Sequence, residues 1–135
     1  MKKTTVKKSR PVVKAPKKST DPTREIAREV AQACHDQKGG DIVVLDLQKI
    51  SSFAEYFIIA SGTSDRQVRA LGEHIEERLK KQGIRPIGVE GYEQGHWVLI
   101  DFGSVVAHLF LEEAREHYDL ENFWKQAKRV RFTLK

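Results

Sequence analysis

The turn Ser61-Gly62-Thr63-Ser64 has residue types that can bind a phosphate, because it follows an apolar run and precedes a helical pattern. Free backbone N–H groups and the helix dipole converge at such a helix start. An ordinary capped turn requires the same residues, and Ser64 stands three residues before Gln67, as in a capping box. Since the chain has neither Gly-x-Gly-x-x-Gly nor a Walker lysine, the pattern favours the capped turn and leaves phosphate binding as the alternative.

Nucleotidyl transfer would also need two nearby carboxylates on a later strand to hold catalytic magnesium. The later apolar segments offer Glu90, Glu93 and Asp101, but no Asp-x-Asp or Asp-x-Glu pair on one strand face. The five histidines show no spacing of the kind seen in zinc sites. We therefore predict no catalytic residue, no metal site and no cofactor, and an enzyme of this type remains the alternative hypothesis.

Two further reactive side chains are predicted to be structural. Cys34 is the single cysteine, which excludes an internal disulfide, and it lies on an apolar helical stripe typical of a small core residue. His108 lies inside an apolar run, where a hydrogen-bonded structural histidine is favoured over a catalytic one. No Ser, Thr or Cys has an evident base partner in the sequence.

The segment Gly95–Gly103 predicts a β-strand with two different faces. Successive side chains of a strand point to opposite sides. One face carries an apolar set that suits a core, namely Val98, Ile100 and Phe102. The other combines a large aromatic side chain with a carboxylate, which is typical of a protein-binding surface, and consists of Trp97, Leu99 and Asp101. The alternative is that a helix of the same chain covers Trp97.

The elements that must position these residues follow from periodicity. Helices are predicted from Pro22 to the Gly39-Gly40 pair and from Ser64 to Gly83, and strands at 41–46, 56–60, 84–89, 95–103 and 105–111. The last two strands should form a hairpin, and Pro86 favours an edge or a strand start over a central position for the strand at 84–89. Residues 112–127 predict a helix that packs onto the sheet through Tyr118, Leu120, Phe123 and Trp124. This order predicts an α/β fold, a single mixed β-sheet of about five strands flanked by helices.

Length and charge divide the chain into two parts. With 135 residues and 39% hydrophobic content, one domain over residues 22–135 can bury a core. Residues 1–21 hold eight Lys or Arg against one acid, whereas the rest holds 16 basic and 18 acidic residues. This Lys-rich segment predicts a disordered arm that contacts RNA phosphates or only aids solubility. With no apolar run of membrane-spanning length and no signal peptide pattern, the cytoplasm is favoured.

From Asp41 to about Ala127 the chain resembles the ribosomal silencing factor (RsfS, Iojap-like) family. Several separated segments in the right order carry the resemblance: Tyr56–Ser64 with Arg66-Gln67-Val68, Glu90-Gly91, Trp97–Gly103, His108, and Tyr118-x-Leu120-Glu121-x-x-Trp124. The resemblance implies a fold similar to that of nucleotidyltransferases but without their catalytic carboxylates. It also implies a homodimer in the free state.

The resemblance further implies an interaction protein. Members bind the large ribosomal subunit through its ribosomal protein number fourteen, and they sterically block joining of the small subunit when nutrients are short. Their partner-binding strand falls on Trp97 and Asp101 here, with Val98, Leu99 and Ile100 between them, and Leu99 shares the face of the two. Ser104 and Glu55 depart from the family, which usually has Asp at both positions, and Ser104 removes an acid near Asp101.

Overall fold

The computed structural model describes residues 21–135, so the predicted arm over residues 1–21 lies outside the described residues except for Asp21. Helices and strands alternate as predicted through the first two thirds of the chain. The elements are α1 (Pro22–Asp36), β1 (Gly40–Asp46), β2 (Tyr56–Gly62), α2 (Asp65–Lys80), β3 (Gly88–Glu90), β4 (Trp97–Asp101), β5 (Val105–Leu111), α3 (Glu112–Tyr118), α4 (Leu120–Phe123) and β6 (Lys128–Val130).

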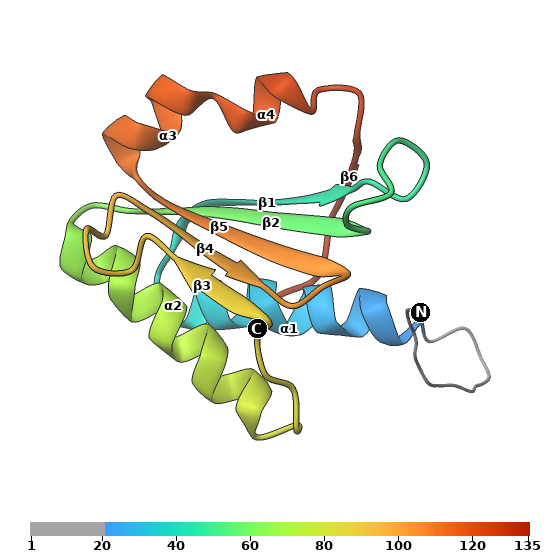
Figure 1. The fold of residues 1–135 in the computed structure, drawn as a ribbon, viewed down its shortest axis with the longest axis horizontal. Coiled ribbons are helices and arrows are strands. Elements are labelled where there is room, and N and C mark those ends of the chain that lie inside the picture. Colours follow the sequence, from blue (N-terminus) through green and yellow to red (C-terminus); the bar gives the residue numbers. More distant parts are fainter. Residues whose placement is uncertain (1–20) are drawn as a thin grey trace.

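One sheet runs through the middle of the molecule in the order β3-β4-β5-β2-β1-β6. β2 and β5 are parallel, with Tyr56 opposite Val105, and the other neighbours are antiparallel. Helices α1 and α2 cover one face, and α3 and α4 cover the other (Figure 1). The predicted mixed sheet flanked by helices is therefore confirmed, with β6 as a sixth strand, and β4 and β5 form the predicted hairpin.

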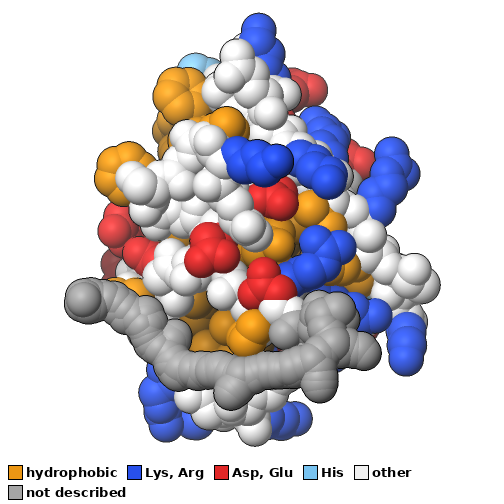
Figure 2. All heavy atoms as spheres, turned by 90° about the vertical axis from the view of Figure 1, so that its right-hand side faces the viewer, with side chains coloured by type: hydrophobic (Ala, Val, Ile, Leu, Met, Phe, Trp, Pro, Cys, Tyr) orange, Lys and Arg blue, Asp and Glu red, His pale blue; other side chains and the backbone are white. Residues whose placement is uncertain are grey.

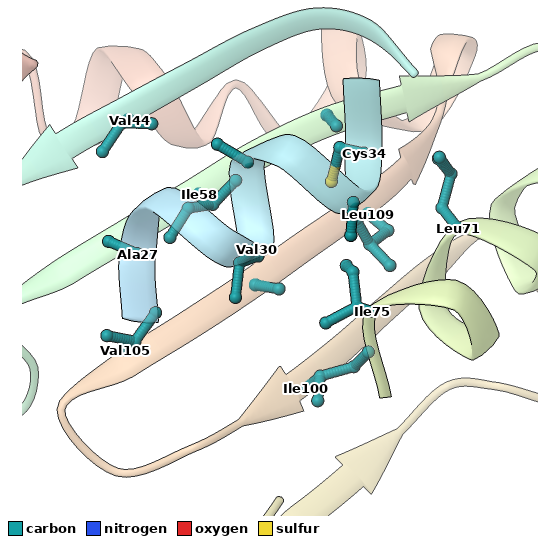
Figure 3. Packing of buried hydrophobic residues seen from close by; sticks show 14 of the residues in the cluster. Ala27, Val30, Cys34, Val44, Ile58, Leu71, Ile75, Ile100, Val105 and Leu109 are labelled. Carbon is teal, nitrogen blue, oxygen red and sulfur yellow. The ribbon is translucent and has the colours of Figure 1, made fainter. Parts of the chain in front are cut away.

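The main core lies between the sheet and the two long helices. Buried apolar side chains of α1 and α2, among them Val30 and Ile75, meet the strand residues Ile58, Ile100 and Leu109 (Figure 3). Cys34 is fully buried in this core, and burial raises the pKa of its thiol to about 12. The prediction that Cys34 is a small core residue is confirmed.

A second apolar cluster fills the space on the other face of the sheet, beneath α3 and α4. Its buried members are Leu45, Leu47, Ala54, Ile59, Val106 and Phe110. Half-buried aromatic and aliphatic side chains from β2, β4 and α4 pack against them, including Phe57, Trp97, Leu99 and Leu120. Apolar side chains thus cover both faces of the sheet. Strands that are buried on both faces are expected to be continuous apolar, β-branched runs, as the central strands of this chain are.

The structure corrects the predictions for two segments. The edge strand predicted at 84–89 extends only over Gly88–Glu90, because Pro86 has no N–H to donate. The single helix predicted over 112–127 is two short helices, since Asp119 adopts a left-handed φ of 50° between them. This break turns Phe123 outward, where it is 77% exposed, so only part of the predicted aromatic set packs on the sheet.

Charged groups are mixed over the end of the molecule where the β1–β2 loop lies. In Figure 2, Lys and Arg side chains alternate with Asp and Glu, and apolar side chains lie between them. This mixture agrees with the nearly balanced charge of the domain in the sequence. The excess of positive charge belongs to the segment outside the described residues.

Candidate docking surface

Strand β4 presents two faces, as its alternating pattern predicts. Val98 and Ile100 are fully buried against α2, whereas Trp97, Leu99 and Asp101 are half-buried on the opposite face. Val98 and Ile100 therefore cannot touch a partner in this fold, because their side chains have no exposed surface. The predicted partner-binding set is thereby restricted to Trp97, Leu99 and Asp101, which we call the Trp97 face, and its role stays a prediction.

The Trp97 indole packs between aromatic rings of two elements. Its centroid lies 4.9 Å from the Phe110 ring of β5 and 4.7 Å from the Tyr118 ring of α3. Its Nε1–H donates a hydrogen bond to Nδ1 of His108 over 3.1 Å. Helix α3 thus covers Trp97 in part, through Tyr118, and the indole stays half-buried. Tyr118 itself is 54% exposed.

Gly91 fixes the backbone of Trp97 from the neighbouring turn. Its φ is +77°, and a Cβ placed on it would lie 2.0 Å from the Trp97 carbonyl oxygen. No side chain fits there, and a left-handed φ also favours glycine. The Glu90-Gly91 pair noted in the sequence therefore serves as a close contact that sets where β4 begins.

Asp101 closes the turn between β4 and β5. Its Oδ1 accepts a hydrogen bond from the Gly103 backbone N–H over 2.7 Å. Within residues 21–135 no ion pair involves this carboxylate. The departure Ser104 lies in the same turn, where its carbonyl accepts from the N–H groups of Glu55 and Tyr56. Ser104 therefore joins this turn to the start of β2.

His108 is buried beneath the Trp97 face, with 4% of its surface exposed. Burial lowers the pKa of its imidazole to about 4, so the ring is neutral at physiological pH. The ring accepts from Trp97, and the Phe57 ring lies edge-on at 4.4 Å. The prediction of a hydrogen-bonded structural histidine is confirmed, and its partner is the indole of Trp97.

Backbone donors at the turn predicted as an alternative phosphate site are engaged by nearby side chains. The Gln67 N–H donates to Ser64 Oγ over 3.1 Å, and the Thr63 N–H donates to Gln67 Oε1 over 2.7 Å. This pattern resembles a capping box, except that the Gln67 side chain accepts from the N–H of Thr63 and not from that of the N-cap residue Ser64. In the part of the chain that the structure describes, no group of three His, Cys, Asp or Glu side chains could hold a metal ion. The geometry favours the capped turn.

Comparison with known families agrees with the motifs and the fold. A family model described as "Ribosomal silencing factor during starvation", RsfS, matches residues 20–135. This chain belongs to the RsfS family. The matched range contains every residue of the Trp97 face together with His108 and Tyr118.

Relatives of known name and structure cover most of the same range. A protein from Chromobacterium violaceum named ribosomal silencing factor RsfS is 43% identical over 101 residues, covering 75% of this chain and 83% of that protein. A crystal structure of a protein from the same organism has a TM-score of 0.75 at 39% identity, covering 84% of this chain and 93% of that one. A mouse protein named mitochondrial assembly of ribosomal large subunit protein 1 is 37% identical over 87 residues, covering 62% of this chain and 38% of that protein.

One partly buried ion pair of this RsfS-family chain was missed by sequence reasoning. The side chain of Arg115 in α3 is 11% exposed and forms a bidentate ion pair with Glu121. Its Nε donates to Oε1 over 2.9 Å, and its Nη2 donates to Oε2 over 3.1 Å. Its guanidinium also donates to Ser61 Oγ over 2.7 Å and to the Gly40 carbonyl over 3.3 Å. Arg115 thus ties α3 and α4 to the ends of β1 and β2, and it holds the layer that carries Tyr118.

The Arg115–Glu121 pair makes stability depend on pH. Hydrogen bonds from Arg115 hold the pKa of the Glu121 carboxyl below its usual value of 4.5. A lowered pKa adds stability above the unfolded-state pKa, and this stability is lost as the pH falls through the folded-state pKa. We expect Glu121→Gln to lower the free energy of unfolding by about 1.5–3 kcal/mol at pH 7, and the difference to shrink towards pH 3.

Urea denaturation of both proteins between pH 7 and pH 3 measures this prediction. Glu55 has a pKa raised by burial and by the charges of Asp21 and Asp46, and it affects both proteins alike, so it cancels in the comparison. A difference that stays constant over the whole range would contradict the assignment.

No helix among residues 21–135 is long and apolar enough to cross a membrane.

Proposed function

We propose that this chain binds the large ribosomal subunit through ribosomal protein number fourteen and sterically blocks joining of the small subunit when nutrients are short. The description of its family names ribosome silencing during starvation, and the name of the mouse relative refers to the large subunit. The resemblance of the Trp97–Gly103 segment to the partner-binding strand of the family supports the choice of surface. The proposal places the activity in the cytoplasm.

The observation that carries this proposal is the half-buried, oriented indole of Trp97. Tryptophan at the centre of an interface contributes a large share of binding energy, above all where neighbouring contacts exclude water. Leu99 adds an apolar contact on the same face, and Asp101 supplies a carboxylate for a partner's Lys or Arg. A surface of this kind recognises a protein that offers an apolar pocket beside a basic group.

The proposed mechanism requires affinity and bulk, and no bond is made or broken. Strand β4 is the second strand from one edge of the sheet. Helices α1 and α2 cover one face of this sheet, and α3 and α4 cover the other (Figure 1). Once the Trp97 face is engaged, the rest of the domain projects from the bound subunit. Occupation of the surface that the small subunit needs is then sufficient for silencing.

Sedimentation with isolated large subunits tests this function. The chain should pellet with large subunits, and its addition should reduce the joined particles formed when small subunits are supplied. Large subunits that lack ribosomal protein number fourteen are the matched control and should leave the chain in the supernatant. Pelleting with small subunits alone, or equal pelleting with the depleted large subunits, would refute the proposed partner.

The alternative of a nucleotidyltransferase-like enzyme makes a separate prediction. A nucleotide that bound the Ser61–Ser64 turn at a hundred times its dissociation constant would add about 2.7 kcal/mol to the free energy of unfolding. We expect no shift of the melting temperature with ATP and magnesium, because the Thr63 N–H donates to Gln67 and the Ser64 hydroxyl oxygen accepts from the Gln67 N–H, as in an ordinary helix cap. A dose-dependent rise that disappears in Ser64→Ala would favour the enzyme.

Two further proposals accompany the ribosomal one. We propose that the free chain forms a homodimer, which light scattering after gel filtration measures. We also propose that the Lys-rich arm contacts ribosomal RNA, in which case deletion of residues 1–21 reduces the salt dependence of subunit binding. Neither proposal concerns the geometry of the Trp97 face.

A further inference from the structure

The orientation of the Trp97 indole depends on one polar contact. Tilted ring contacts with Phe110 and Tyr118 confine the indole, but apolar contact alone does not select the direction of its N–H edge. The hydrogen bond from Nε1 to Nδ1 of His108 does. Leu99 lies directly opposite His108 across the β4–β5 pair, so the histidine side chain lies next to that of Leu99 on the same face of the sheet.

The imidazole of His108 has no other polar role. Because Nδ1 accepts from Trp97, the proton of the neutral ring is on Nε2, and among the described residues this buried atom has no hydrogen-bond partner. An unpaired buried N–H destabilises the folded state. An apolar side chain at this position would avoid that loss, since Phe57 and Phe110 surround it. The unpaired N–H of His108 therefore destabilises the folded state, and the polar contact that the histidine makes is its hydrogen bond with Trp97.

We propose that His108 is a positioning residue of the docking surface, which holds the Trp97 indole in the orientation that the partner recognises. The inference rests on the proposed function, in which Trp97 enters a pocket of the partner. His108 itself is buried and does not touch the partner. It acts by fixing one rotamer before binding, so that less side-chain freedom is lost when the complex forms.

The unmodified protein offers a direct test in solution. The indole ¹⁵N–¹H resonance of Trp97, assigned with Trp97→Phe, should show a scalar coupling across the hydrogen bond to Nδ1 of His108. The indole of Trp124, the other tryptophan of the chain, serves as the internal reference. A missing coupling in the folded protein at neutral pH would overturn the inference.

Two substitutions then separate positioning from packing. His108→Leu removes the acceptor and the unpaired N–H together, whereas His108→Asn places an amide oxygen near the position of Nδ1. We expect the Trp97 resonance to shift in His108→Leu and to return towards its original position in His108→Asn, while that of Trp124 stays. The melting temperature of His108→Leu should stay within about 5 °C of the unmodified protein or rise.

Binding to large subunits gives the functional result. His108→Leu should bind about fivefold more weakly, as expected for one hydrogen bond, and His108→Asn should recover most of the affinity. An unchanged affinity of His108→Leu, or equal loss in both variants, would overturn the positioning role. If the unmodified chain itself fails to bind, the proposed function fails, whereas the resonance measurements still decide whether His108 orients Trp97.

Discussion

Replacing Trp97 by alanine will weaken binding to the large ribosomal subunit by about 2 kcal/mol or more, roughly thirtyfold in affinity. The indole is half-buried between Phe110 and Tyr118, so it is held in place while part of its surface remains available. Truncation removes both the partner contact and the shield over neighbouring groups. Cosedimentation at a series of subunit concentrations measures the loss.

Phe123→Ala is the matched control for this prediction. Phe123 lies on α4 on the same side of the sheet and is 77% exposed, yet it is outside the Trp97 face. Its removal should leave subunit binding within about twofold of the unmodified chain. Unchanged cosedimentation of a folded Trp97→Ala protein, or equal losses in the two variants, would exclude the Trp97 face as the docking site.

Replacing Ile100 by alanine is expected to lower the free energy of unfolding by about 2–5 kcal/mol. The side chain is fully buried, and its Cδ1 would lie 3.4 Å from a Cβ placed on Gly72 of α2. Because residue 72 is a glycine, α2 already lies close to the sheet at this point. We therefore expect the helix to move only slightly into the cavity that the substitution leaves. Chemical denaturation followed by circular dichroism gives the difference.

Leu99→Ala tests the opposite face of the same strand. Leu99 is half-buried, so its truncation removes less apolar contact and should cost less stability than Ile100→Ala. It should nevertheless weaken subunit binding more, once both proteins are compared under conditions where they are folded. Equal stability losses, or a larger binding defect in folded Ile100→Ala, would contradict the assignment of the two faces.

Periodicity predicted most of the fold because the apolar residues of this chain repeat strictly. The stripe of α2 and the alternation in β4 each have one solution that buries the apolar set. Strand β6 was not predicted, because Lys128-Arg129-Val130 offers three residues with one apolar side chain, and only pairing with β1 makes it a strand. The break at Asp119 was missed for a similar reason, since no glycine marks its left-handed φ.

The candidate site was predictable as a strand face but not as an arrangement of neighbours. Alternation alone places Trp97 and Asp101 on one side of β4. The contacts that orient Trp97 come from His108 and Tyr118, which later elements bring to it, and no local pattern encodes them. Arg115 could have been noticed as a lone base among the acids of residues 112–116, but its partners Ser61 and Gly40 are distant in sequence.

The parallel pairing of β2 with β5 has a consequence for the order of folding. β1–β2 and β4–β5 each join segments that are close in the chain, whereas Tyr56 must find Val105 to complete the sheet. Joining distant segments carries the largest loop-closure entropy and slows folding. Trp97, His108 and Tyr118 all lie on the later segment, so we expect the contacts among them to form within one contiguous stretch of chain. The contacts of Arg115 with Gly40 and Ser61, which hold the layer of Tyr118, require the earlier segment, so we expect that layer to become fixed only when the central pair closes, the step that sets the folding rate.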